Sequence, residues 1–348
     1  ASKIWNSIIS SAWASAEPGL HFIDRSNKMS NSWYFARLQA TNPCGEQPLE
    51  AYGVCTLGAI NLAKFVDEDS DVLWTELRQV VRTAVRLLDN VIDVNEYHFP
   101  EINDNHRGNR RIGLGVMGLA EMLVRMGLKY GGEEAVVFTN ALFETLAEEA
   151  YMASVDLAKE KGAFPRFDAE KYLQSGFMRG MSTEVRAAVR QHGIRNVCLL
   201  TVAPTGTTGT MMGTSTGIEP YFDWTYSRQS RLGVHTEVVP VIKDLGLDLQ
   251  NLPSYCVTTR DLAPEDHINI QSVAQRWVDS AISKTTNCPS DYTVDETDRL
   301  YRLAYDKGCK GITIYRDGSR HEQVLNSDDN VEDESCRIDD PDCQTCAL

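Results

Sequence analysis

The stretch TNPCGEQPLEAYGVC, residues 41–55, places an amide, a thiol and a carboxylate at alternate positions. These groups belong to Asn42, Cys44 and Glu46. Because Pro43 disfavours helical backbone at the residue before it, we expect an extended segment here, with the three side chains on one side. The pattern predicts a site in which all three groups face one ligand.

Cys44 stands beside a carboxylate, and not beside the histidine or cation that activates a nucleophilic cysteine. A neighbouring carboxylate raises the pKa of a thiol. The Cys44 thiol is therefore better suited to hydrogen-atom chemistry, with Glu46 as a base and Asn42 as a hydrogen-bonding group. Cys55 supplies a second thiol eleven residues further along the chain.

The chain has 348 residues, of which 42% are hydrophobic and 24% charged, and this composition is typical of a soluble globular protein. No run approaches the roughly 18 apolar residues of a membrane span. Residues 1–20 lack the basic start and apolar centre of a signal peptide. Nine cysteines are an odd number in a chain too large to depend on disulfides. We expect a cytoplasmic protein with reduced thiols.

The net charge of −15 argues against a nucleic-acid or membrane partner, because both need clustered positive charge. Residues 326–348 hold eight acids and one arginine, a net charge of −7, which leaves −8 of the −15 for the rest of the chain. Because this segment has few large apolar residues, we expect a flexible acidic tail after a globular part formed by residues 1–325.

Cys343 and Cys346 form a C-x-x-C within this tail. One such pair is half of a zinc site, and neither Cys336 nor His321 has the spacing that would complete it. We expect a dithiol that exchanges with a disulfide elsewhere in the protein, and no bound metal. Four other cysteines lie among apolar or turn residues and are expected to serve packing: Cys198, Cys256, Cys288 and Cys309.

Apolar residues at three-and-four spacing predict a helix over residues 74–97. Further helices are expected over about 114–126 and about 133–161, the last ending at Gly162. The apolar runs at residues 196–204 and 308–316 predict strands. The class is mixed α/β.

Three glycines, Gly113, Gly115 and Gly118, form a G-x-G-x-x-G that could be taken for a dinucleotide-binding turn. That fingerprint must follow a buried strand, and the residues before it are polar and basic. We therefore interpret these glycines as positions where a helix packs closely on a neighbour.

The segment APTGTTGTMMGTSTGIEP, residues 203–220, follows a predicted strand and is rich in Thr, Ser and Gly. One interpretation is a flexible surface loop. The other is an anion site, because hydroxyls and free backbone N–H groups at the end of a buried strand can hold a phosphate without any lysine. The residue pattern leaves both open.

Seven motifs in order resemble the C-terminal half of a ribonucleotide reductase, most similar to the adenosylcobalamin-dependent class II: NPCGEQPL, CTLGAINLAKF, RRIGLGVMGLAEML, APTGTT, GTSTGIEPYF, AISKTTNCP and GITIYRDGSR. The resemblance implies the second half of a ten-stranded α/β barrel, with a central finger loop that carries the radical cysteine. It also implies that ribonucleoside diphosphates are reduced to 2′-deoxyribonucleoside diphosphates.

The resemblance assigns roles to the residues of the first stretch. Cys44 would be the radical cysteine that abstracts the ribose 3′ hydrogen, and Glu46 the base for the 3′ hydroxyl. Asn42 would hold the substrate hydroxyls. Cys55 would be one of two cysteines that are oxidised to a disulfide as the 2′ hydroxyl leaves as water.

The resemblance also assigns the phosphate-binding segment and the tail thiols. The substrate phosphates would be bound by Pro204, Thr205, Gly206, Thr207 and Thr208. The family commonly has Ser where this chain has Gly209. Cys343 and Cys346 resemble the tail pair that reduces the active-site disulfide before thioredoxin or glutaredoxin reduces the tail.

The predicted strand that contains Tyr315 helps to distinguish the classes of reductase. Class I large subunits have two adjacent tyrosines that relay a radical, whereas Tyr315 here stands between Ile314 and Arg316. The glycyl-radical motif of the anaerobic class is also absent. Adenosylcobalamin is the cofactor that remains.

The family's partner for Cys55 and part of its cobalamin site lie in the first half of the full protein. We therefore expect a separate N-terminal half as a partner, in an oligomer. The alternatives are a fragment of a class I large subunit and a non-catalytic half-reductase that regulates or scaffolds a complete enzyme.

Overall fold

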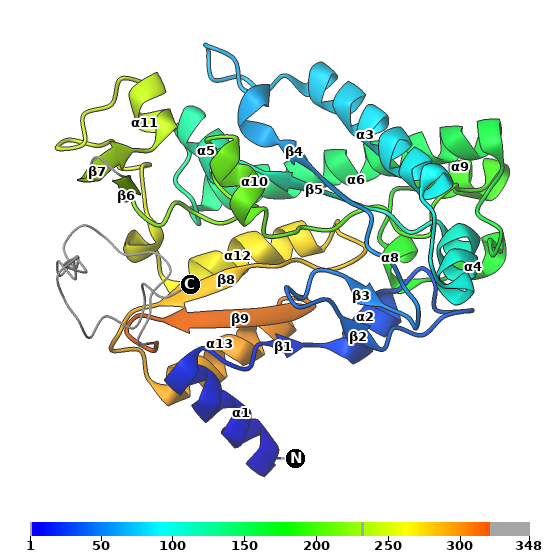
Figure 1. Ribbon diagram of the computed structural model, residues 1–348, viewed down its shortest axis with the longest axis horizontal. Coiled ribbons are helices and arrows are strands. Elements are labelled where there is room, and N and C mark those ends of the chain that lie inside the picture. Colours follow the sequence, from blue (N-terminus) through cyan, green and yellow to red (C-terminus); the bar gives the residue numbers. More distant parts are fainter. Residues whose placement is uncertain (1, 231–232, 321–348) are drawn as a thin grey trace, which may run out of the picture.

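The protein is described by a computed structural model that covers residues 2–230 and 233–320 (Figure 1). Within these residues the fold is mixed α/β, as predicted. The expected tail at 326–348, with Cys343 and Cys346, lies outside the described residues.

Helices and strands alternate near the two ends of the described chain, and residues 119–211 hold six helices in succession. The α-helices are α1 (Ser2–Ser15), α2 (Ile23–Met29), α3 (Trp74–Val94), α4 (Pro100–Asn109), α5 (Leu119–Arg125), α6 (Glu133–Lys161), α7 (Ala169–Tyr172), α8 (Gly176–Arg179), α9 (Thr183–His192), α10 (Gly206–Met211), α11 (Pro240–Asp244), α12 (Pro264–Gln275) and α13 (Val294–Asp306). The 3-10 helices are η1 (Leu62–Phe65) and η2 (Thr259–Asp261). The strands are β1 (Leu20–His21), β2 (Ala40–Thr41), β3 (Pro48–Leu49), β4 (Leu57–Asn61), β5 (Gly113–Met117), β6 (Thr225–Ser230), β7 (Gly233–Val238), β8 (Thr285–Cys288) and β9 (Gly311–Arg316).

Parallel pairing organises the centre of the fold. β4 pairs with β5, and β8 pairs with β9. Single parallel bridges, Leu114 to Leu200 and Val202 to Ile282, connect these two pairs through the extended segment 199–202. β1 pairs antiparallel with β9. Among the described residues these strands form an open arrangement and no closed barrel, so the ten-stranded barrel stays a prediction.

Two predicted helices are confirmed. α3 buries Leu77, Val81 and Leu88 from the apolar stripe that predicted it, and it packs on α6 (Figure 1). α6 ends before Gly162, whose φ of 85° is a backbone conformation that glycine adopts without steric cost. Hydrophobic burial on one face and a glycine stop are local signals, which is why the sequence was sufficient here.

The helix predicted over residues 114–126 is wrong in its first part. Residues 113–117 form the buried strand β5, and the helix α5 begins only after Gly118, whose φ is 80°. A Cβ at Gly115 would lie 2.4 Å from the Thr201 carbonyl oxygen, so a side chain there would prevent the parallel pairing. The glycines therefore allow two strands to approach, and they do not pack a helix.

The two predicted strands differ in outcome. β9 at Gly311–Arg316 confirms the strand predicted at 308–316. Residues 196–204 are extended and hydrogen-bonded to neighbours on both sides, for example from Leu114 N to Leu199 O at 2.7 Å and from Val202 N to Ala281 O at 3.2 Å. They pair through single bridges and not through a full strand.

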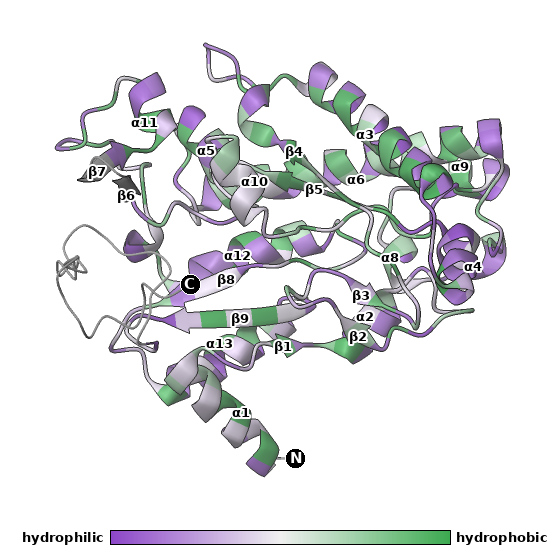
Figure 2. Ribbon diagram, in the orientation of Figure 1, coloured by the Kyte–Doolittle hydropathy of each residue, from purple (hydrophilic) through white to green (hydrophobic). Residues whose placement is uncertain are grey.

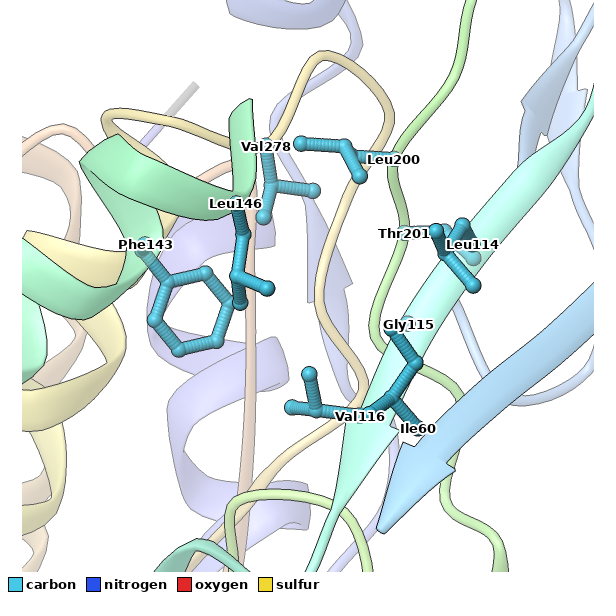
Figure 3. A pocket seen from close by; sticks show the side chains of 9 residues that line it. All are labelled: Ile60, Leu114, Gly115, Val116, Phe143, Leu146, Leu200, Thr201 and Val278. Atoms are coloured by element: carbon cyan, nitrogen blue, oxygen red, sulfur yellow. The ribbon is translucent and has the colours of Figure 1, made fainter. Parts of the chain in front are cut away.

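The core lies between the parallel strands and the long helices. Figure 2 shows hydrophobic colouring along β5 and β9, whereas α4 is mostly hydrophilic. Cys198, Cys256, Cys288 and Cys309 are buried, as expected for packing residues. An apolar cavity of about 10 Å³ lies between α6 and the strands, next to Phe143, Leu146 and Thr201 (Figure 3). It has room for about one water molecule and none for a nucleotide. No helix in the described ranges is long and apolar enough to cross a membrane.

Candidate active site

Residues 42–47 form a tight turn between β2 and β3. Asn42 Oδ1 accepts a hydrogen bond from Gln47 N at 3.0 Å, and Gly45 N donates to Asn42 O at 3.0 Å. Gly45 has a φ of 82°. The extended segment that we expected is therefore wrong, because an Asn side chain closes a turn on its own backbone and a glycine supplies the left-handed residue.

Cys44 and Glu46 differ in solvent exposure although they lie on the same turn. Cys44 is exposed, whereas Glu46 is only 2% exposed. Burial raises the pKa of the Cys44 thiol, and the Glu46 carboxylate raises it further. Burial and Glu46 also raise the pKa of the Cys55 thiol, and Arg111 opposes them. The fold thus brings both thiols into the field of one carboxylate, which together with burial raises the pKa of each.

The backbone of Glu46 is fixed from two sides. Its carbonyl oxygen accepts hydrogen bonds from Thr201 Oγ1 at 2.8 Å and from Ala281 N at 2.9 Å. Its side-chain oxygen Oε2 is buried and has no hydrogen-bond partner within the described part of the chain. Buried polar atoms are nearly always satisfied, so this oxygen is available to a donor group of a ligand. Thr201 was not predicted from the sequence, because only the fold brings it to the turn.

The predicted phosphate-binding segment is partly helical. Thr205 lies in the left-handed region with a φ of 51°, and its Oγ1 accepts a hydrogen bond from Gly217 N at 2.8 Å. α10 begins at Gly206, and residues 206–208 are exposed. The first N–H groups of a helix have no partner within it. The hydroxyls of Thr207 and Thr208 and these N–H groups form a surface that can accept an anion.

Packing explains the glycine at position 209. Gly209 is buried, and a Cβ there would lie 2.9 Å from Thr216 Cγ2. A serine would require Thr216 to shift. The glycine therefore fits the local geometry of this segment.

An ion pair between a buried lysine and a partly exposed glutamate holds the end of the same segment. Lys284 Nζ donates to Glu219 Oε2 at 2.5 Å, and Thr285 N donates to Glu219 Oε1 at 2.6 Å. Burial lowers the pKa of Lys284, and Glu219 opposes that shift. These contacts fix Glu219 to the start of β8. Glu219 and Lys284 lie in two of the seven motifs, but no local pattern indicates that they pair, because they are 65 residues apart in the chain.

A second ion pair, between Glu50 and Arg111, is buried beside the segment that leads to Cys55. Arg111 Nη2 donates to Glu50 Oε2 at 2.9 Å. Both residues were missed by the sequence reasoning, in which Arg111 counted only as part of a basic run. A lone acid in PLEAY and the arginine pair RR were the available signals. On β9, the Tyr315 hydroxyl is buried and has no hydrogen-bond partner among the described residues.

Comparison with known proteins gives a family and several relatives. Residues 1–315 match the family described as "Ribonucleotide reductase, barrel domain". A vitamin B12-dependent ribonucleoside-diphosphate reductase of Mycobacterium tuberculosis is 39% identical over 94% of this chain and 48% of its own length. The enzyme of the same name from Thermoplasma acidophilum is 36% identical over 93% of this chain and 44% of its own.

A more distant relative is the ribonucleoside-diphosphate reductase subunit alpha of Chlamydia pneumoniae, which is 27% identical over 89% of this chain and 34% of its own length. The chain spans about half the length of the first two relatives. The family match covers nearly all of the described residues and includes the turn, residues 203–220 and all of β9 except its last residue, Arg316. The chain belongs to the ribonucleotide reductase barrel-domain family.

Proposed function

We propose that this chain is the C-terminal, catalytic-loop half of a cobalamin-dependent ribonucleoside-diphosphate reductase. The observation that carries the proposal is the turn that holds Cys44 and Glu46: one Glu46 side-chain oxygen is buried with no hydrogen-bond partner among the described residues, and the Glu46 charge raises the pKa of the Cys44 and Cys55 thiols. Family membership supports the same reading. The test is reduction of ribonucleoside diphosphates by this chain combined with a polypeptide that resembles the other half.

In this proposal each residue of the turn has one task. The Cys44 thiyl takes the 3′ hydrogen atom from the ribose and returns it at the end. Glu46 accepts the proton of the 3′ hydroxyl, and Asn42 holds the substrate hydroxyls. Cys55 and a second cysteine lose two electrons and two protons to form a disulfide, and the 2′ hydroxyl leaves as water. The deoxynucleotide and one water account for all atoms and electrons.

The residues present fit a radical cofactor that approaches from outside. Cys44 is exposed on a tight turn, and burial together with Glu46 keeps its pKa raised, so a hydrogen atom can be removed from its sulfur. When bound, adenosylcobalamin would supply the radical that removes that hydrogen atom. Cys44 is the residue of this chain that would have to face it. The names of two relatives support this cofactor.

The alternatives have less support. The relatives named subunit alpha are less similar, at 27% for that of Chlamydia pneumoniae, and Tyr315 has no neighbouring tyrosine for a relay. A non-catalytic scaffold has no use for a buried carboxylate oxygen without a hydrogen-bond partner on the same turn as an exposed thiol. Neither alternative is favoured.

The phosphate-binding assignment gives one prediction. Replacing Thr207 and Thr208 together by Val should raise the KM for a ribonucleoside diphosphate about tenfold or more, with a small change in kcat. Each hydrogen bond to a charged group contributes about 1.5–3 kcal/mol, and 1.4 kcal/mol corresponds to about tenfold in affinity. Steady-state kinetics of the complete assembly measures both constants.

Thr210→Val is the matched control for this prediction. The Thr210 hydroxyl donates to Gly206 O at 2.8 Å and is therefore engaged within α10. We expect its KM to stay within about twofold of the unchanged protein. An equal rise in KM for both variants would show that α10 had unfolded, and no rise for the double variant would remove the phosphate assignment.

The tail gives another prediction, and we propose that residues 326–348 act as a redox segment separate from residues 1–325. Replacing Cys343 and Cys346 by Ser should stop thioredoxin- or glutaredoxin-driven turnover but spare a single turnover of pre-reduced enzyme. The tail thiolate would attack the active-site disulfide, and the second tail thiol would release it by forming the tail disulfide. Product per enzyme in one burst, with and without thioredoxin, measures the effect. An unchanged thioredoxin-driven rate would show that the tail is not the shuttle.

A further inference from the structure

The segment between the turn and Cys55 is hydrogen-bonded to α4 and to Arg111, which lies two residues beyond the end of α4. Glu50 Oε2 accepts a hydrogen bond from Arg111 Nη2 at 2.9 Å. Glu50 Oε1 accepts from Asn109 Nδ2 at 2.5 Å and from Asn105 Nδ2 at 3.2 Å. Asn105 Nδ2 also lies 3.2 Å from the carbonyl oxygen of Ala51. Side chains of residues 105–111 thus hold both the acid and the backbone beside it.

These contacts are deeply buried. Glu50 is 7% exposed and Arg111 is 2% exposed. Burial raises the pKa of Glu50, but Arg111 and the hydrogen bonds outweigh it, and the pKa is lowered overall. A buried ion pair adds little net stability compared with apolar residues of the same size, so stability alone does not account for it. Fixing one conformation of the segment around Glu50 does account for the ion pair.

The backbone next to Glu50 is in a conformation that needs such fixing. Gly53 N donates to Glu50 O at 3.0 Å and closes a turn over residues 50–53. Within this turn, Tyr52 has a φ of 59°. An aromatic residue seldom adopts the left-handed region, and it does so when the surrounding structure holds it there. Tyr52 is 58% exposed, so its own side chain is not what holds the turn.

The far end of the segment is tied to the same region. Gly113 N donates to Thr56 O at 2.8 Å, and His106 Nε2 lies 3.4 Å from Thr56 Oγ1. Cys55 therefore lies between two attachments, the Glu50 carboxylate on one side and Thr56 on the other. The turn with Cys44 is fixed independently, through the carbonyl oxygen of Glu46.

We propose that Glu50 is a positioning residue, whose carboxylate, held by Arg111, Asn105 and Asn109, fixes the turn 50–53 and so sets the place of Cys55 relative to Glu46. The inference rests on the proposed function, in which Cys55 is a redox thiol. Glu50 touches neither the substrate nor the reacting atoms. Its contribution is that Cys55 meets the substrate and the tail thiol at one position.

The test compares the double variant Glu50→Leu/Arg111→Met with the unchanged full chain. Removing both partners avoids an unpaired buried charge, which by itself could unfold the protein. We expect a similar unfolding temperature but about tenfold or faster hydrogen exchange in peptides covering residues 50–56. Exchange at residues 40–48 should change by less than about twofold, because Thr201 and Ala281 still hold Glu46.

Arg110→Met is the matched control. Arg110 is the neighbouring buried arginine, and it donates to Asp89 Oδ1 and to Asp93 Oδ1, both at 2.8 Å, on α3. Arg195 and Lys161 remain near Asp89. We expect unchanged exchange at 50–56 in this variant. If the double variant does not fold, Asn105→Ala, which keeps the ion pair and removes the bonds to Glu50 Oε1 and Ala51 O, should give a local increase in exchange at the same residues.

Kinetics of the complete assembly separates this inference from the proposed function. The double variant should lose about tenfold or more in kcat with KM within about twofold, because substrate binding does not use Cys55. Unchanged exchange at 50–56 in a folded double variant would overturn the positioning role whatever the activity. Two results together would support the positioning role and refute the proposed function. These are faster exchange at 50–56 in the double variant, and no nucleotide reduction by the unchanged chain in any assembly.

Discussion

Replacing Cys44 by Ser is expected to abolish nucleotide reduction in the complete assembly. Cys44 is the exposed thiol of the turn, and Glu46 and burial keep it protonated. A serine hydroxyl has nearly the same size, but its O–H bond is too strong for the radical exchange that an S–H bond allows. Deoxynucleotide formation should therefore fall below detection, with or without added dithiol.

Nucleotide affinity of this variant should stay nearly unchanged, within about 0.5 kcal/mol, because the substitution removes one sulfur atom from a surface turn. Equilibrium binding of a ribonucleoside diphosphate measures it. Cys256→Ala is the control, since Cys256 is buried away from the turn and should leave activity intact. Turnover by the Cys44→Ser assembly in the presence of a small dithiol would refute the assignment of the radical cysteine.

The chain alone is expected to be inactive and to gain activity only with a polypeptide that supplies the other half. β4 pairs with β5 on one side, and no described strand pairs with its other edge. On α3, which contacts β4, Leu87 is 62% exposed and Val94 is 80% exposed. An unpaired strand edge beside exposed apolar side chains favours association. We expect an interface above about 2,000 Å², as in obligate complexes.

The chemistry leads to the same expectation. Cys55 needs a second accessible cysteine to form a disulfide during substrate reduction. Apart from Cys44 and Cys55, the cysteines of the described residues are buried: Cys198, Cys256, Cys288 and Cys309. Burial raises the pKa of Cys198 to about 12, and a buried unreactive thiol of this kind cannot exchange electrons with a substrate. Among the described residues Cys55 therefore has no accessible partner other than Cys44, and we expect the other polypeptide to supply the second thiol.

The measurement is to purify this chain alone and together with a polypeptide that resembles the N-terminal half of its relatives. Sedimentation gives the mass of the complex, and an assay with adenosylcobalamin gives nucleotide reduction. Cys44→Ser in the same complex controls for contaminating reductase. Unaided turnover by a monodisperse single chain would contradict the prediction. Stimulation by an iron-containing second subunit in place of cobalamin would favour the class I alternative.

Local sequence patterns determined part of this structure. The apolar stripe of α3, the glycine stop of α6 and the β-branched run of β9 each depend on neighbours a few residues away, and all three are observed as predicted. The burial of Cys198 and its three counterparts followed from their apolar or turn context. The motif order was also enough to identify the family, because seven short segments in sequence are far more specific than any one.

Other features depended on contacts that no local pattern records. β5 was predicted as helix because its glycines and apolar residues fit either element, and only the pairing with β4 and the approach to Thr201 make it a strand. The order of Asn42, Cys44 and Glu46 suggested an extended segment, whereas the Asn42 side chain and Gly45 close a turn.

The environment of the thiols was decided by tertiary structure alone. Glu46 is held by hydrogen bonds from Thr201 and Ala281, and Glu50 is held by hydrogen bonds from side chains of residues 105–111. The sequence placed a carboxylate beside a thiol and could predict the direction of the resulting pKa shift. It could not show that the carboxylate would be buried with one oxygen unpaired, because burial and pairing depend on segments up to about two hundred residues away that meet only after folding.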